Sequence, residues 1–133
     1  MKILLTGANG YIGVRLLYEL LKQDHEVVCA VRNAARLSVP QEIREQIEIV
    51  EIDFLKIHTD QALPKDIDAA YYLIHSMSSS TDDFDQMEAE SAQSFVELVH
   101  KTNCKQVIYL SGIVNEEQLS KHLLSRKRVE DIL

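Results

Sequence analysis

The glycines of this chain are concentrated in one short segment whose spacing suits phosphate binding. Three of the four lie three residues apart, at Gly7, Gly10 and Gly13. In a strand-to-helix turn, the first glycine permits a tight turn, the second lets the backbone approach a pyrophosphate, and the third allows the helix to pack closely. The N–H groups that open the helix then point at the anion. The alternative is an ordinary strand-to-helix turn. The residues predicted to bind a dinucleotide here are Gly7, Asn9, Gly10, Tyr11, Ile12 and Gly13.

The residue that follows the second apolar run indicates which dinucleotide is bound. An acid at this position would hydrogen-bond the ribose 2′-hydroxyl of NAD, whereas an arginine can pair with the 2′-phosphate of NADP. The chain has Arg32 here, followed by Asn33 and Arg36. These residues predict that NADP(H) is preferred over NAD(H). The alternative is that the arginines are solvent-exposed loop residues.

Two later segments are expected to complete the pocket. Asp53 and Phe54 follow the third apolar run, where a carboxylate can accept a hydrogen bond from the adenine amino group and a ring can flank the base. Ile74 and His75 follow the fourth run, at the carboxyl end of the sheet, where ligands gather in such folds. The alternatives are an acidic loop residue beside a core aromatic, and a structural histidine.

The elements that must position these residues are short apolar runs separated by helical periodicity. The runs are continuous rather than alternating, which is typical of parallel strands covered on both faces. The expected strands are Lys2 to Thr6, Glu26 to Val31, Ile47 to Ile52, Ala69 to Ile74 and Gln106 to Leu110.

Helical patterns fill the intervals between these runs. The expected helices are Tyr11 to Lys22, a short one within Pro40 to Gln46, Asp82 to Lys101 with Ser80 or Thr81 as its N-cap, and Leu119 to Leu133. Alternating strands and helices predict an α/β fold with a doubly wound parallel sheet, of strand order 3-2-1-4-5 and helices on both faces. This is a Rossmann fold, and residues 1–133 are expected to form a single NAD(P)-binding domain.

The length, composition and charge of the chain limit the classes of partner that it can bind. A length of 133 residues with 46% hydrophobic content suits one globular domain. The formal charge of −7 disfavours nucleic acid and anionic lipid, and no apolar run reaches the roughly 20 residues of a membrane helix. Cys29 and Cys104 are too few and too far apart for a disulfide framework, and no metal site is expected. We therefore expect a cytoplasmic protein that binds a small molecule.

Taken together, these segments resemble the atypical or extended short-chain dehydrogenase/reductases, and within them the NmrA-like NAD(P)H-binding group. The resemblance is carried by residues 6–13, 30–33, 53–54, 72–77 and 108–112. It implies an NADP-type cofactor across the first four strands, with Asp53 near the adenine and Ser111 near the nicotinamide. It also implies a C-terminal segment that grips the substrate. The chain ends at Leu133, within an apolar helical pattern. We therefore expect the chain to be the N-terminal part of a longer reductase-like protein.

The chain departs from this family in one respect. Family enzymes carry a Tyr-x-x-x-Lys pair on the helix after strand five, whose lysine lowers the pKa of the tyrosine. The helix expected at that place in this sequence contains no tyrosine and so has no such pair. His122 and Arg126 keep the same four-residue spacing, which suggests a proton donor and its cofactor-facing partner. Ser111 would orient a carbonyl substrate. The alternative is that His122 and Arg126 are exposed polar residues and that Ser111 belongs to a turn.

Three functions remain open at this stage. The first is an oxidoreductase that transfers hydride between NADP(H) and an unknown small molecule. The second is a non-catalytic module that senses NADP(H) and reports through a partner, and the missing tyrosine favours it. The third is a nucleotide-sugar epimerase or dehydratase, which the same absence weakens. The resemblance also points to a homodimer formed through the helix Asp82 to Lys101.

Overall fold

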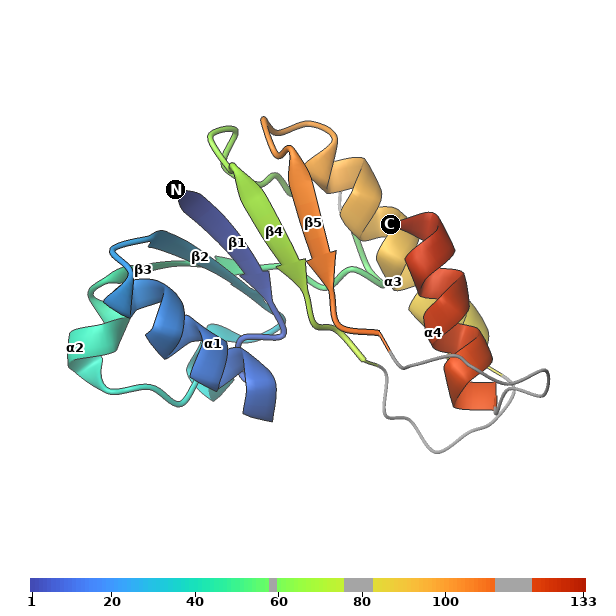
Figure 1. The fold of residues 1–133 in the computed structure, drawn as a ribbon, viewed down its shortest axis with the longest axis horizontal. Coiled ribbons are helices and arrows are strands. Elements are labelled where there is room, and N and C mark those ends of the chain that lie inside the picture. The colour runs from blue at the N-terminus through green and yellow to red at the C-terminus, as the bar shows by residue number, and fades with distance from the viewer. Residues whose placement is uncertain (58–59, 76–82, 112–120) are drawn as a thin grey trace.

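The computed structural model describes residues 1–57, 60–75, 83–111 and 121–133. These residues form a five-stranded parallel sheet of order β3-β2-β1-β4-β5, which confirms the predicted fold (Figure 1). The strands are β1 (Lys2–Thr6), β2 (Glu26–Val31), β3 (Ile47–Glu51), β4 (Ala69–Tyr72) and β5 (Gln106–Tyr109).

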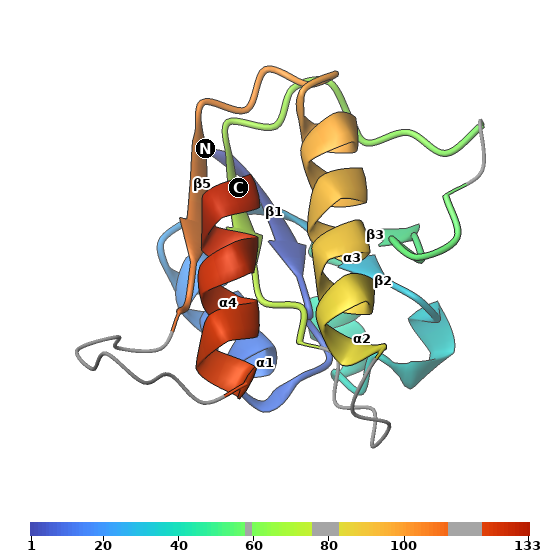
Figure 2. The same ribbon diagram turned by 90° about the vertical axis from the view of Figure 1, so that its right-hand side faces the viewer.

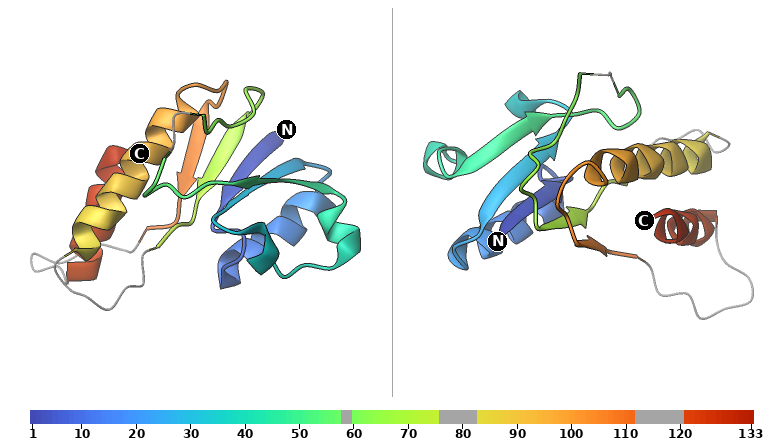
Figure 3. Two further views of the ribbon diagram at one scale, coloured as in Figure 1. Left: turned by 180° about the vertical axis from the view of Figure 1, so that it is seen from behind. Right: turned by 90° about the horizontal axis from the view of Figure 1, so that it is seen from above.

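The helices cover the two faces of the sheet, as the sequence predicts. They are α1 (Tyr11–Lys22), α2 (Gln41–Arg44), α3 (Phe84–Val99) and α4 (Lys121–Ile132), with a 3-10 turn, η1, at Ala34–Arg36. Figure 2 shows α3 and α4 side by side, and the view from above in Figure 3 shows them across the sheet from α1. None of the described helices is both long enough and apolar enough to cross a bilayer.

Successive side chains of each strand point to opposite faces, so the sheet has two cores. Leu4 and Tyr72 pack on the face that carries Phe95 of α3 and Val129 of α4. The opposite face is built on α1 and includes Leu5. β1 and β2 are therefore buried on both sides, which explains why their sequences read as unbroken apolar runs.

Several predicted boundaries differ from the structure by one or two residues. β4 ends at Tyr72 rather than Ile74 because the N–H of Leu73 donates to the side-chain hydroxyl of Thr6, at 3.0 Å, instead of to a neighbouring strand's carbonyl. α3 ends at Val99 rather than Lys101, where the Thr102 hydroxyl donates to the Val99 carbonyl. The predicted N-caps of α3 and the first residues predicted for α4 lie outside the described residues.

The apolar side chains of α1 are buried to different extents. Ile12, in the first turn, is 46% exposed, whereas Leu17 and Leu20 of the same helix are buried. The apolar stripe identifies a helix face, but only the turns that lie opposite the sheet are covered.

Candidate functional site

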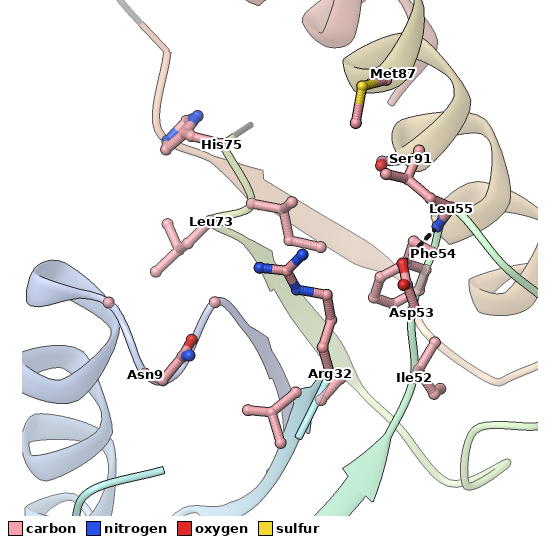
Figure 4. A pocket seen from close by; sticks show the side chains of 15 residues that line it. Asn9, Arg32, Ile52, Asp53, Phe54, Leu55, Leu73, His75, Met87 and Ser91 are labelled. Carbon is pink, nitrogen blue, oxygen red and sulfur yellow. Dashed lines mark hydrogen bonds between the residues drawn. The ribbon is translucent and has the colours of Figure 1, made fainter. Parts of the chain in front are cut away.

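The site is a cavity of about 630 Å³ at the carboxyl ends of β1 to β4, bordered by α3 (Figure 4). Ligands bind at this edge in doubly wound folds, where the strand order reverses on either side of β1. Eight of the residues that the sequence predicts to bind cofactor do line this cavity: Gly7, Asn9, Gly10, Arg32, Asp53, Phe54, Ile74 and His75.

The glycine loop at one end of this cavity cannot accommodate side chains. Gly7 has a φ of +65°, in the left-handed region that favours glycine. A Cβ on Gly13 would lie 2.1 Å from the Gly7 carbonyl oxygen, so the start of α1 packs directly on the loop. Gly10 borders the cavity and caps α1 without a side-chain hydrogen bond to the first turn. The N–H groups there keep their capacity to bind an anion, so the cradle fits the pyrophosphate of a dinucleotide.

Other residues predicted to bind cofactor lie around the cavity without lining it. Gly13 is buried behind the loop, while Tyr11 and Ile12 are 76% and 46% exposed on the outer side of α1. Asn33 and Arg36 are exposed in the segment after β2. These five residues lie next to the pocket in sequence but do not line it.

α3 also contributes to the cavity, which the sequence does not predict. Met87 and Ser91 line the cavity, and Ser91 is only 3% exposed. The helical periodicity that predicted α3 does include both residues on its buried face. The periodicity does not indicate, however, that this face of α3 extends beyond the core and borders the cavity.

The side chains that line the cavity after β2 and β3 differ in how accessible they are to a ligand. In Figure 4 the exposed Arg32 side chain extends from the end of β2 toward the cavity. The Asp53 carboxylate accepts a hydrogen bond from the N–H of Leu55 at 3.0 Å through Oδ1. Among the described residues, its Oδ2 has no hydrogen-bond partner, so it remains an acceptor for an amino group. Phe54 is only 5% exposed and packs edge-on against Phe95, which leaves little of its ring for a base.

The opposite end of the cavity adjoins a group of polar side chains between β4, β5, α3 and α4. Glu88 of α3 and Ser125 of α4 are 4% and 1% exposed, and the Ser125 hydroxyl donates to the Glu88 carboxylate at 3.0 Å. The Tyr109 ring lies 6.3 Å from that of His75, measured between ring centroids. Within the described part of the chain, the buried Tyr109 hydroxyl has no hydrogen-bond partner, and burial raises its pKa to about 12.

The structure describes the surroundings of two of the three residues predicted to be catalytic, Arg126 and Ser111. Arg126 of α4 is half-buried and close enough to His75 and Tyr109 to alter the pKa of each. The Ser111 hydroxyl donates to the Glu130 carboxylate at 3.3 Å. His122 belongs to α4, but its side chain lies outside the described residues.

Titration of His75 tests this arrangement. Burial lowers the pKa of His75, and the positive charge of Arg126 lowers it further, while Glu88 partly opposes both. The neutral imidazole is therefore favoured in the folded protein. The stability that follows from the shift is present above the ordinary pKa and is lost as the pH falls through the lowered one. In an NMR titration, Arg126→Gln should raise the midpoint of His75, whereas Arg128→Gln, an exposed arginine of the same helix, should not. A midpoint that is unchanged by Arg126→Gln would contradict the arrangement.

Comparison with known proteins agrees with this geometry. The family described as NAD(P)H-binding matches residues 7–132 of the chain. The chain belongs to the NAD(P)H-binding family. The match confirms the predicted NAD(P)H-binding domain over nearly the whole chain.

Two known proteins are similar to parts of the chain. A 69-residue segment is 39% identical to an isonitrile lipopeptide synthase of Streptomyces coeruleorubidus, covering 50% of this chain and 5% of that protein. A 34-residue segment is 53% identical to a ketoreductase of Cercospora nicotianae, covering 26% of this chain and 10% of that protein.

Among solved structures, a Bacillus halodurans protein described as an NAD-dependent epimerase/dehydratase superposes with a TM-score of 0.76 at 24% identity. It covers 99% of this NAD(P)H-binding domain, which spans 64% of that protein. A triphenylmethane reductase of Citrobacter gives a TM-score of 0.71 at 17% identity, and the domain spans 44% of it. These similarities show a shared fold, and the domain is shorter than each of these proteins.

Proposed function

We propose that this NAD(P)H-binding domain serves an oxidoreductase that transfers hydride between NADP(H) and a small carbonyl-type molecule. The observation that carries the proposal is the cavity itself, which is lined both by the glycine loop and by Arg32 at the end of β2. Similarity to a ketoreductase and a triphenylmethane reductase supports the reaction class.

Each end of the cavity has a distinct role in this proposal. Backbone N–H groups around Gly7 and Gly10 bind the pyrophosphate, and the Arg32 guanidinium pairs with the 2′-phosphate. The free oxygen of Asp53 accepts from the adenine amino group. The bound cofactor supplies the hydride, while His75 and Ser111 hold the substrate near the carboxyl ends of β4 and β5. Burial and the positive charge of Arg126 lower the pKa of His75, which favours the neutral imidazole that can donate or accept a hydrogen bond without adding charge.

The proton donor in this proposal is His122, which takes the position of the family tyrosine. The test follows NADPH absorbance while a panel of small aldehydes and ketones is added to the protein. Turnover that is lost in His122→Ala and kept in Arg128→Ala would support the proposal. Turnover that His122→Ala leaves unchanged would contradict this role.

A second candidate is a domain that senses NADP(H) without reducing anything, which is favoured because the sequence of α4 contains no Tyr-x-x-x-Lys pair. Saturable NADPH binding with no turnover across the panel would support it over the oxidoreductase. An epimerase or dehydratase of nucleotide sugars is a third candidate, supported by the similarity to the Bacillus halodurans protein. Conversion of a nucleotide sugar without net consumption of the dinucleotide would distinguish it from both.

A further inference from the structure

The segment that joins β2 to α2 is held in place by side chains from two other elements. The N–H of Ala34 donates to the carboxylate of Glu51, the last residue of β3, at 2.7 Å. The Nη2 of Arg44, on α2, donates to the carbonyl oxygens of Ala34 and Leu37, at 3.1 and 2.7 Å. Both polar backbone atoms of Ala34 are therefore bonded to side chains that are distant in sequence.

The same segment is also closed by its own hydrogen bonds. The Asn33 side chain accepts from the N–H of Ala35 at 2.9 Å, and the N–H of Arg36 donates to the Asn33 carbonyl at 3.1 Å. Leu37 anchors the end of the segment, with only 1% of its surface exposed. A 3-10 turn of three residues is not stable by itself, so η1 depends on these contacts.

The arginines predicted to bind phosphate flank this fixed turn. Arg32 precedes it and Arg36 ends it, and both side chains are exposed. Arg44 differs from them because its guanidinium is half-buried and bonded to two backbone carbonyls. Its role is therefore to hold the backbone rather than to contact a ligand.

We propose that Arg44 and Glu51 are positioning residues for the 2′-phosphate of NADP(H), because they fix the backbone that carries Arg32 and Arg36. The proposal rests on the proposed function and deepens it. A turn that is already ordered loses less conformational freedom when the Arg32 guanidinium binds a phosphate, so the affinity for NADP(H) increases. NAD(H) has a hydroxyl in place of that phosphate, so its affinity depends much less on Arg44 and Glu51.

Two kinds of substitution separate positioning from a direct charge effect. Arg44→Met removes the donors and keeps an aliphatic chain of similar length. Glu51→Ala removes the acceptor of the Ala34 N–H, whereas Glu51→Gln keeps an acceptor oxygen and removes only the charge. Arg128→Met is the matched control, since it removes one positive charge from an exposed position on α4.

The experiment measures the dissociation constants of NADPH and NADH by fluorescence titration of each variant. Arg44→Met and Glu51→Ala should each weaken the binding of NADPH about 5- to 10-fold and the binding of NADH less than about twofold. This is the scale expected for a lost pre-organising contact. Glu51→Gln and Arg128→Met should leave the ratio of the two constants close to that of the unmodified protein. Equal losses for both nucleotides, or an unchanged ratio in Arg44→Met and Glu51→Ala, would overturn the proposal.

A second readout needs no nucleotide. In the free protein, hydrogen exchange of the Arg36 and Leu37 amides should become faster in Arg44→Met and remain unchanged in Arg128→Met. Unchanged exchange in Arg44→Met would also overturn the proposal. The Arg32→Ala variant, titrated in parallel, separates the two levels of the argument. If Arg32→Ala removes the preference for NADPH and Arg44→Met does not alter it, only the positioning role fails. If Arg32→Ala leaves the preference intact, the assignment of the 2′-phosphate site fails as well.

Discussion

Replacing Gly13 with alanine should abolish high-affinity nucleotide binding and lower the free energy of unfolding by about 3 kcal/mol, the upper range for overpacking a tight site. The added Cβ would lie 2.1 Å from the Gly7 carbonyl oxygen and 2.9 Å from the Cα of Ala8. Both neighbours are backbone atoms, so the start of α1 must move away from the loop. Because Gly7 and Gly10 line the cavity proposed to hold the pyrophosphate, that movement should weaken the binding of NADPH and NADH alike. Thermal or urea unfolding and nucleotide titration measure the two effects.

The Gly10→Ala variant is the matched control for this prediction. Its Cβ would meet only the Gly7 carbonyl oxygen, at 3.3 Å, so stability should change by less than about 1 kcal/mol. The methyl group would still stand at the wall of the cavity and weaken both nucleotides. We therefore expect Gly13→Ala and Gly10→Ala to differ in stability, whereas both should bind the nucleotides more weakly than the unmodified protein. A Gly13→Ala protein with unchanged stability would contradict the described contact between α1 and the loop.

The Arg32→Ala variant should lose most of the preference for NADPH over NADH. A hydrogen bond to a charged group contributes about 1.5–3 kcal/mol, so NADPH affinity should fall roughly 10- to 100-fold while NADH affinity changes little. Since the proposed contact joins a guanidinium and a phosphate, the preference for NADPH should also weaken as salt is raised. Titration of both nucleotides at low and high salt measures this.

Arg128→Ala serves as the control for net charge, because Arg128 is exposed on α4 on the opposite side of the fold from α1. This variant should keep the ratio of the two affinities. An Arg32→Ala protein that still prefers NADPH as strongly as the unmodified protein would exclude Arg32 as the determinant.

The sequence predicted the parts of the site that depend on local pattern. The glycine loop is one such part, because the turn at Gly7 and the close contact of Gly13 involve residues within a few positions of each other. Arg32 is another, because its place at the end of a buried strand follows from the apolar run before it. The order of the strands followed from the alternation of strands and helices.

The parts that the sequence did not predict depend on contacts between distant segments. Nothing in the pattern around Arg44 or Glu51 indicates that both bond to Ala34. The end of β4 was placed too late because the Thr6 hydroxyl, more than sixty positions away, takes the N–H of Leu73. Periodicity identified the buried face of α3 but not that Met87 borders the cavity. In each case the partner is set by the tertiary arrangement rather than by the local sequence.

The most direct test of the account is a calorimetric titration of the unmodified protein with NADPH and, separately, with NADH. We predict saturable binding of one NADPH per chain, with a dissociation constant about tenfold or more below that for NADH, as expected for one additional charge-assisted contact. Equal affinities for the two nucleotides, or no binding of either, would contradict it.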